Sequence, residues 1–306
     1  MELLTSQWQL HRCVSAVLRL VDGYVGRPRV LISASSARWA RFYCTACLAA
    51  VALLACGSVL GGEARERQGD DAEATDGRID EILTKLEERS EGLTDIQCKV
   101  VFVEEDRINL SKRTKHGRIL FLITEPNPHF MIHFSHTEMD GGVLGKQEWY
   151  LFDGRWLHQA IERIKQVTKQ EIVRPGEKTD LFDLERAPFP LPFGQSKQKI
   201  RRNFEVNLVP PAEGDPADTD HLVCVPKVDS RLYRRYDKLE FFVRRDVHLP
   251  CRIVVHKSGG LEINTAGFPD LSAASINGGM GRGAFALPRA WKDYKTVVEA
   301  LPAEGE

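Results

Sequence analysis

Apolar and polar positions alternate with a period of two through most of the chain beyond residue 94. In "HFMIHF", Phe130, Ile132 and Phe134 point to one side of a strand and the intervening residues to the other. The same alternation occurs in "TDIQCKVVFVEED", "GRILFLITEP", "KQEWYLFDGRWLHQA" and "YDKLEFFVRRDVHLPCRIVVH". These segments predict a large antiparallel sheet. Asp153-Gly154, between two aromatic-rich runs, predicts a hairpin with a type I′ turn.

A helical period precedes the strands. In "DGRIDEILTKLEERSEG", Ile79, Ile82, Leu83 and Leu86 recur at i, i+3, i+4 and i+7 on an otherwise charged helix. Asp76 is available as its cap, and Gly92 is expected to end it. Such an apolar stripe needs a partner surface.

A proline-rich insert separates the two groups of strands. Residues 188–194 hold three prolines within five positions and large apolar side chains. The insert is too apolar for a solvent loop and too rich in proline for a ladder strand, so it predicts a cover. A short basic helix is expected next, over residues 195–204. The predicted lid comprises Ile79, Ile82, Leu83, Leu86, Phe189, Leu191 and Phe193.

Together these elements predict an α+β fold that is mostly β: a strongly curved antiparallel sheet, or incomplete β-barrel, with a helical and Pro-rich lid. Several strands are apolar on both faces, which is more than a one-sided sheet requires. The extra apolar side chains are either ordinary core or the lining of a cavity for acyl chains. The expected lining is Phe102, Leu120, Leu122, Phe130, Ile132, Phe134, Trp149, Leu151, Leu239 and Phe241.

The N-terminal region has the character of an export signal. Arg38 and Arg41 precede an apolar run over residues 42–60, and a polar stretch follows. Leu53-Leu54-Ala55-Cys56 resembles a bacterial lipobox, which predicts lipidation at Cys56. A retained helix in the inner membrane and cleavage near Gly61 are the alternatives. All three place the body of the protein in the periplasm or cell envelope.

The predicted organisation has five parts. Residues 1–37 are an unassigned leader that a mis-called start codon would explain, and residues 62–77 are an acidic linker. The boundaries are 1–37 leader, 38–61 signal sequence or membrane anchor, 62–77 linker, 78–298 β domain and 299–306 tail.

Charge and cysteine content exclude some functions. Beyond residue 61 the chain carries 42 − 6 = 36 basic and 43 − 2 = 41 acidic residues, so bulk charge gives no reason to bind nucleic acid. Cys98, Cys224 and Cys251 are too widely spaced for a metal knuckle. They form either one pair plus a free thiol or three buried small side chains.

The sequence offers little catalytic chemistry. His129 and His133 would share a strand face about 13 Å apart, too far for one ion, so His129, His133 and His136 are expected to be exposed strand residues. No Ser or Cys nucleophile motif is present. The sequence therefore predicts neither an enzyme, nor a cofactor, nor a metal site.

Two charged clusters flank the insert. Asp180, Asp183 and Glu185 predict an acidic turn rather than a catalytic pair. The basic cluster Lys197, Lys199, Arg201 and Arg202 is either a solvated helix face or a contact for an acidic partner or lipid head groups.

The order of these elements resembles the periplasmic outer-membrane lipoprotein carriers (LolA-like). The matching phrases are "IDEILTKLEE", "LTDIQCKVVFVEED", "GRILFLITEPNPHFMIHF", "EWYLFDGRWLHQ" and "KLEFFVRRDVHLPCRIVVH". A closer likeness is to an uncharacterised family of secreted planctomycete LolA-like proteins, with a similar "LPFG" insert. This chain departs from the carriers at Thr124-Glu125-Pro126-Asn127, where they have Lys-Arg-Pro-Asn. Glu125 lacks the donors with which that arginine ties the lid.

The resemblance implies an exported or lipid-anchored envelope protein that binds a lipid or lipoprotein acyl chain noncovalently in an apolar concavity. The alternative is an envelope protein–protein interaction or stress-sensor module on the same fold, without lipid cargo. An open apolar groove would favour the carrier, and a packed interior would favour the interaction module.

Overall fold

The structure is a computed structural model that describes residues 63–178 and 196–301, with side chains from residue 73 onward. The predicted leader, signal, acidic turn and Pro-rich insert, with Cys56, Phe189, Leu191 and Phe193, lie outside the described residues, as does the predicted tail beyond residue 301. None of the described helices is long and apolar enough to cross a membrane.

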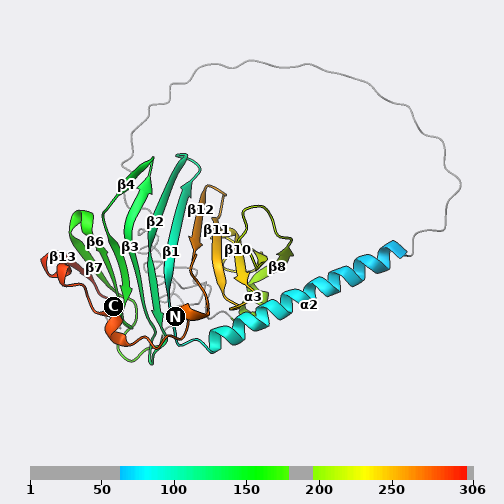
Figure 1. Cartoon of the computed structure of the whole chain (residues 1–306), viewed down its shortest axis with the longest axis horizontal. Coiled ribbons are helices and arrows are strands. Elements are labelled where there is room, and N and C mark those ends of the chain that lie inside the picture. Colours follow the sequence, from blue (N-terminus) through cyan, green and yellow to red (C-terminus); the bar gives the residue numbers. More distant parts are fainter. Residues whose placement is uncertain (1–62, 179–195, 302–306) are drawn as a thin grey trace, which may run out of the picture.

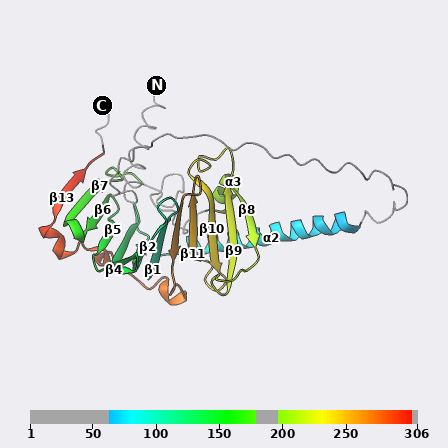
Figure 2. The same ribbon diagram turned by 90° about the horizontal axis from the view of Figure 1, so that it is seen from above.

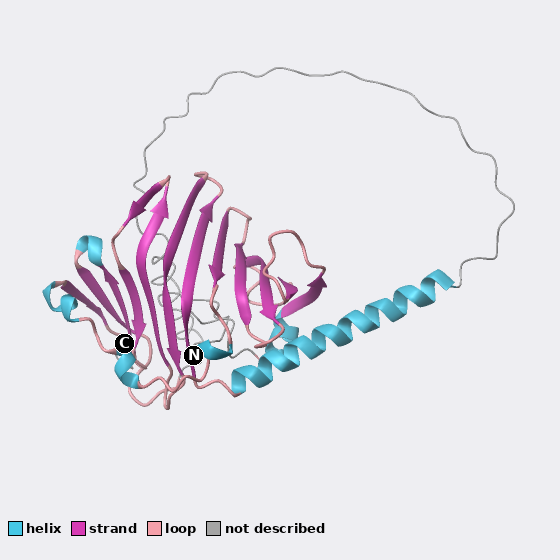
Figure 3. Ribbon diagram, viewed as in Figure 1, coloured by secondary structure: helices cyan, strands magenta, loops and turns pink. Residues whose placement is uncertain are grey.

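Strands dominate the described chain (Figure 3). The helices are α2 (Glu63–Glu91) and α3 (Lys197–Asn203), with short 3₁₀ turns η1 (Glu162–Ile164), η2 (Ala273–Ser275), η3 (Arg282–Phe285) and η4 (Arg289–Asp293). The strands are β1 (Asp95–Asp106), β2 (Ser111–Leu122), β3 (His129–Met139), β4 (Gly142–Leu144), β5 (Glu148–Phe152), β6 (Trp156–Ile161), β7 (Gln166–Glu171), β8 (Phe204–Val209), β9 (Thr219–Pro226), β10 (Tyr236–Arg244), β11 (Pro250–Lys257), β12 (Glu262–Gly267) and β13 (Lys295–Glu299).

All thirteen described strands belong to one sheet, in the order β13-β7-β6-β5-β3-β2-β1-β12-β11-β10-β9-β8, with β4 beside β3. Every pairing is antiparallel except β13 with β7. The pairing of β1 with β12 joins the early and late strand groups, and the sheet follows a curve without closing (Figures 1 and 2). The predicted mostly β fold with a curved, incomplete barrel is therefore confirmed.

The helix α2 is longer than expected. It begins at Glu63, so most of the predicted linker at residues 62–77 is helical, and Asp76 lies inside the helix rather than at its cap. Alanine, glutamate, arginine and glutamine in this stretch are good helix formers, and this outweighs the acidic composition that suggested a tether. The predicted end is confirmed: the Gly92 N–H donates to the Glu88 carbonyl at 3.2 Å.

The hairpin between β5 and β6 is confirmed, but its predicted turn type is wrong. Three residues separate the strands, and of these Gly154 alone has a positive φ, at 95°. The Asp153 side chain accepts hydrogen bonds from the backbone N–H groups of Arg155 and Trp156. This side-chain contact stabilises a longer turn, so a second left-handed residue is not needed.

The two faces of the sheet are covered differently. On one face, which we call the inner face, side chains from both strand groups and from α2 form a single large apolar cluster. Side chains converge on the concave side of a curved sheet and diverge on the convex side, so this continuous cluster marks the concave side. On the opposite, outer face, the buried apolar side chains form two small clusters under residues 280–294.

Candidate binding surface and polar clusters

The ten side chains expected to line one cavity lie on two faces. Phe102, Phe130, Ile132, Phe134, Leu239 and Phe241 belong to the inner cluster or pack against it. Leu120, Leu122, Trp149 and Leu151 lie on the outer face, where Phe285 and Trp291 cover them. The sequence-based set therefore mixed two surfaces because β2 and β5 are apolar on both sides. Lipid binding by any of these residues stays a prediction.

The pairing register shows which inner residues the sequence prediction missed. Across β5, β3, β2 and β1, one row of neighbours runs through Phe152, Phe130, Phe121 and Ile96. The next row runs through Tyr150, Ile132, Ile119 and Cys98. Residues opposite each other in a ladder share a face. Once Phe130 and Ile132 are placed inside, the register therefore assigns Ile119 and Phe121 to the inner face.

The apolar stripe of α2 packs on the inner face. Ile79, Ile82, Leu83 and Leu86 are each at most 5% exposed and belong to the inner cluster. The sheet is thus the partner surface that the stripe requires. Among the described elements, α2 lies beside α3 and β8, at one end of the sheet (Figure 1).

Ion pairs connect α2 to α3 beside this cluster. Asp80 contacts Lys197 Nζ at 2.9 Å and Arg201 Nη2 at 2.6 Å, and Arg201 Nη1 lies 2.8 Å from Asp76. Hydrogen bonds from Lys197 and then Arg201 lower the pKa of Asp80. Lys197 and Arg201 therefore form neither a solvated face nor a free partner contact, because they bind the protein's own helix. We call these contacts of Asp76 and Asp80 with Lys197 and Arg201 the α2–α3 ion pairs.

A buried charged group interrupts the inner face. Lys115 is 6% exposed, and its Nζ lies 3.2 Å from Glu148, 3.5 Å from Glu104 and 5.7 Å from the centre of the Phe134 ring. Burial alone would lower the pKa of Lys115, but Tyr150 and the two carboxylates raise it above its ordinary value. Lys115 therefore stays charged and provides a polar contact beside the aromatic side chains.

The three described cysteines are free thiols. Burial raises the pKa of Cys98 and of Cys224 to about 12, and both belong to the inner cluster. Cys251 is half-buried and packs against that cluster. The interpretation as small buried side chains is confirmed for Cys98 and Cys224. The rate at which a reagent modifies these two thiols therefore measures how often the inner face becomes accessible.

Residues 124–127 tie several segments together. The Asn127 amide donates to the carbonyls of Gly154 and Glu177, and the exposed Glu125 carboxylate pairs with Lys178 at 2.8 Å. Glu125 therefore accepts from a lysine just ahead of the Pro-rich insert, in a largely exposed contact. An arginine at that position would donate instead.

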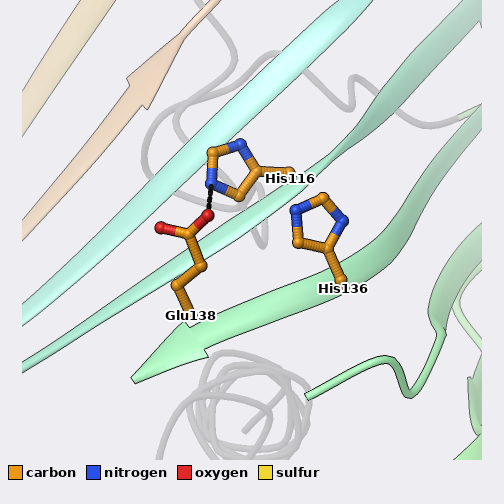
Figure 4. A group of neighbouring side chains, drawn as sticks. All are labelled: His116, His136 and Glu138. Carbon is orange, nitrogen blue, oxygen red and sulfur yellow. Dashed lines mark ion pairs between the residues drawn. The ribbon is translucent and has the colours of Figure 1, made fainter. Parts of the chain in front are cut away.

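The strand histidines were expected to be exposed, but His129, His133 and His136 are all half-buried and have polar partners. His129 contacts the Thr124 hydroxyl at 2.9 Å, and His133 contacts the Gln147 side chain at 2.7 Å. His136 instead joins His116 and Glu138 on the outer face, with one ligand-type atom of each residue within 4.8 Å of the others (Figure 4). Distance along one strand could not reveal this group, because His116 comes from β2.

These features define a curved β-sheet protein with one large apolar cluster on its inner face, and with small apolar clusters and polar groups on its outer face. No family model matches the chain, and no curated protein matches it significantly.

Solved structures share part of this architecture. An uncharacterised conserved protein of Thermus thermophilus is 14% identical, with 72% of this chain and 99% of that chain covered and a TM-score of 0.37. The LolA superfamily protein NE2245 of Nitrosomonas europaea is 13% identical, covering 68% and 97%, at 0.30. MucB of Pseudomonas aeruginosa, solved in complex with MucA, is 17% identical, covering 69% and 61%, at 0.31.

Proposed function

We propose that the protein is exported to the cell envelope and binds a lipid or lipoprotein acyl chain noncovalently on its inner face, in exchange for the α2 stripe. The observation that supports this is the packing of four aliphatic α2 side chains onto one continuous apolar surface. Withdrawal of α2 would uncover the part of that surface next to α3 and β8, and an acyl chain has the shape and chemistry to replace the stripe.

The energies of the two occupants are of the same order. Burial of four aliphatic side chains contributes about 6–12 kcal/mol at roughly 1.5–3 kcal/mol each. An acyl chain of about 16 carbons contributes about 12 kcal/mol at roughly 0.8 kcal/mol per CH₂. Replacing one with the other is therefore close to balanced, as reversible carriage requires.

The polar contacts of α2 add little resistance to its withdrawal. Asp76, Asp80 and Arg201 have side chains that are 66%, 44% and 30% exposed. Exposed ion pairs contribute roughly 0–1 kcal/mol each. The α2–α3 ion pairs would thus orient the helix while an apolar ligand competes for the surface beneath it. The Lys115 group lies beside Phe134 and offers a polar contact for the ligand's head.

The test combines ligand uptake with thiol access in the full chain, purified without detergent. Native mass spectrometry and organic extraction detect a bound lipid, and peptide mapping follows alkylation of Cys98 and Cys224. Added fatty acid should bind and change the rate at which both thiols react. Leu83→Ala, which loosens α2, should increase uptake and alkylation. Leu122→Ala on the outer face is the matched control and should leave uptake unchanged. A bare protein mass, with no fatty acid uptake in wild type or Leu83→Ala, would overturn the carrier.

The second candidate is an envelope protein–protein interaction module. The observation that favours it is that the α2 stripe is already buried in the inner cluster, where it occupies the apolar surface next to α3 and β8. In this case the partner is a protein and the inner cluster is structural core. A bare mass together with thiols that react at the same slow rate with and without fatty acid would support this candidate.

A further inference from the structure

We propose that His116, His136 and Glu138 form a binding site for a divalent transition-metal ion, with Zn²⁺ as the type ion. Two imidazoles and one carboxylate are a ligand set that Zn²⁺ accepts while keeping a position open for water. The three residues come from the neighbouring strands β2 and β3, so an ion would link these strands on the outer face.

A β-bulge brings the ligands together. His116 pairs with His136, whereas Gly117 pairs with Phe134, so Ser135 is an extra residue in β3. Without this insertion His136 would lie on the inner face. The bulge turns His136 and Glu138 outward, opposite His116. Gly117 permits this close approach, because a Cβ there would lie 2.1 Å from the His133 carbonyl oxygen.

Ser135 fixes the state of His136 that binds metal. The Ser135 hydroxyl donates its one hydrogen to the His116 carbonyl at 3.1 Å. Its oxygen therefore accepts from Nδ1–H of His136, at 3.0 Å. This leaves the lone pair on Nε2 of His136 for an ion, as in other sites where an outer hydrogen bond orients a histidine ligand.

The His116 ring carries an unsatisfied polar atom that an ion would satisfy. Nε2 of His116 is buried and has no hydrogen-bond partner, although Glu138 Oε1 lies 3.2 Å away (Figure 4). The two imidazoles stack nearly parallel, with centroids 4.7 Å apart and planes 8° apart. A buried nitrogen without a partner calls for an explanation. An ion bound between this nitrogen and the Glu138 carboxylate would give the nitrogen a partner and would balance the charge of the carboxylate.

Metal binding requires one imidazole to rotate out of the stack, because an ion lies near the plane of each ring that binds it and the two ring planes are only 8° apart. The ligand atoms lie within 4.8 Å of one another. Tetrahedral ligands at about 2.0–2.2 Å from Zn²⁺ are separated by roughly 3.3 Å, so the group must close by about an ångström or more. The Ser135 contact orients the His136 ring. The His116 side chain is 31% exposed and would turn toward the ion, and the Glu138 side chain, 52% exposed, would swing inward.

The test is titration of the metal-free full chain with Zn²⁺ by calorimetry, and with Co²⁺ by visible absorption. We expect one Zn²⁺ equivalent whose affinity falls at least tenfold in His136→Gln and in Glu138→Gln. Ser135→Ala should weaken it by about tenfold, the lower end for loss of an outer-shell contact. His256→Gln, elsewhere on the outer face, is the control. All variants keep the same cysteines, so thiol binding cancels in the comparison.

Glu138→Gln alters an exposed side chain and keeps the test valid if His136→Gln fails to fold. Wild-type affinity unchanged by either substitution would overturn the site, and so would the absence of Zn²⁺ binding to the wild type.

Discussion

The inner and outer faces of this sheet are built from alternate residues of the same strands, yet their chemistry differs sharply. The inner face joins both strand groups and α2 in one apolar cluster. The outer face has small apolar clusters and several histidine–carboxylate contacts, among them Glu240 with His221 at 2.9 Å and with His256 at 2.6 Å. Curvature accounts for the contrast, since convergent side chains exclude water and divergent ones admit it. The proposed apolar ligand and the proposed ion therefore use opposite faces of the same strands.

The largest expected effect is on stability, from Phe121→Ala on the inner face. Phe121 is fully buried, and its loss should lower the free energy of unfolding by about 3–5 kcal/mol. Leu122→Ala, its outer neighbour, should cost about 2 kcal/mol, because residues near Phe285 can close over the smaller side chain. Denaturant unfolding followed by circular dichroism measures both. Equal losses would mean that the inner cluster is not the dominant core.

The second prediction concerns the bulge. Gly117→Ala places a Cβ against the His133 carbonyl, so we expect a loss of about 2–3 kcal/mol in unfolding free energy. Gly267→Ala, also in a strand, meets its nearest atom at 3.8 Å and is the matched control. A loss below about 1 kcal/mol for Gly117→Ala would show that β2 and β3 separate easily there.

Sequence patterns were sufficient for the strands and the helical stripe. The alternation around Phe130 and the i, i+3, i+4, i+7 spacing of Ile79 to Leu86 both depend on local geometry. The predicted start of α2 and the predicted type of the turn at Asp153 were wrong. In the first case helix propensity outweighed an acidic composition. In the second, a side-chain acceptor replaced the expected second left-handed residue.

The site was less predictable, because its residues meet through pairing register. The inner position of Phe121 follows from its pairing with Phe130, and that of Ile119 from its pairing with Ile132. The His116–His136 contact needs, in addition, one inserted residue, Ser135, that reverses the alternation. A single sequence does not specify register or bulges, so the prediction could place Leu120 inside and pass over His116.

The third prediction tests how α2 is held on the inner face. Arg201→Ala removes contacts with Asp76 and Asp80 and should lower the unfolding free energy by no more than about 1 kcal/mol. Alkylation of Cys98 and Cys224 should become several-fold faster as α2 opens more often. Arg202→Ala, an exposed neighbour, should leave both rates unchanged. If Arg201→Ala does not alter labelling, the apolar stripe alone would hold the helix.

The smallest expected effect is a pH dependence confined to the outer side of the β5–β6 hairpin. Burial raises the pKa of Asp153, but hydrogen bonds from His158 and from the backbone of Trp156 and Arg155 outweigh it and bring the pKa to about 2. The unfolded value is about 3.9, so the folded pKa is the lower one. The resulting stability is present above about pH 4 and is lost as the pH falls toward 2.

Asp153→Asn should therefore flatten the decline of the unfolding midpoint between about pH 4 and 2. Its side chain is 37% exposed, so solvent screening keeps the difference small. Trp291, which packs against His158, should report the change through its fluorescence, whereas alkylation of the inner-face Cys98 should not respond. A response of Cys98 equal to that of Trp291 would show that the two faces unfold as one unit. The faces would then differ in their side-chain chemistry but not in their local stability.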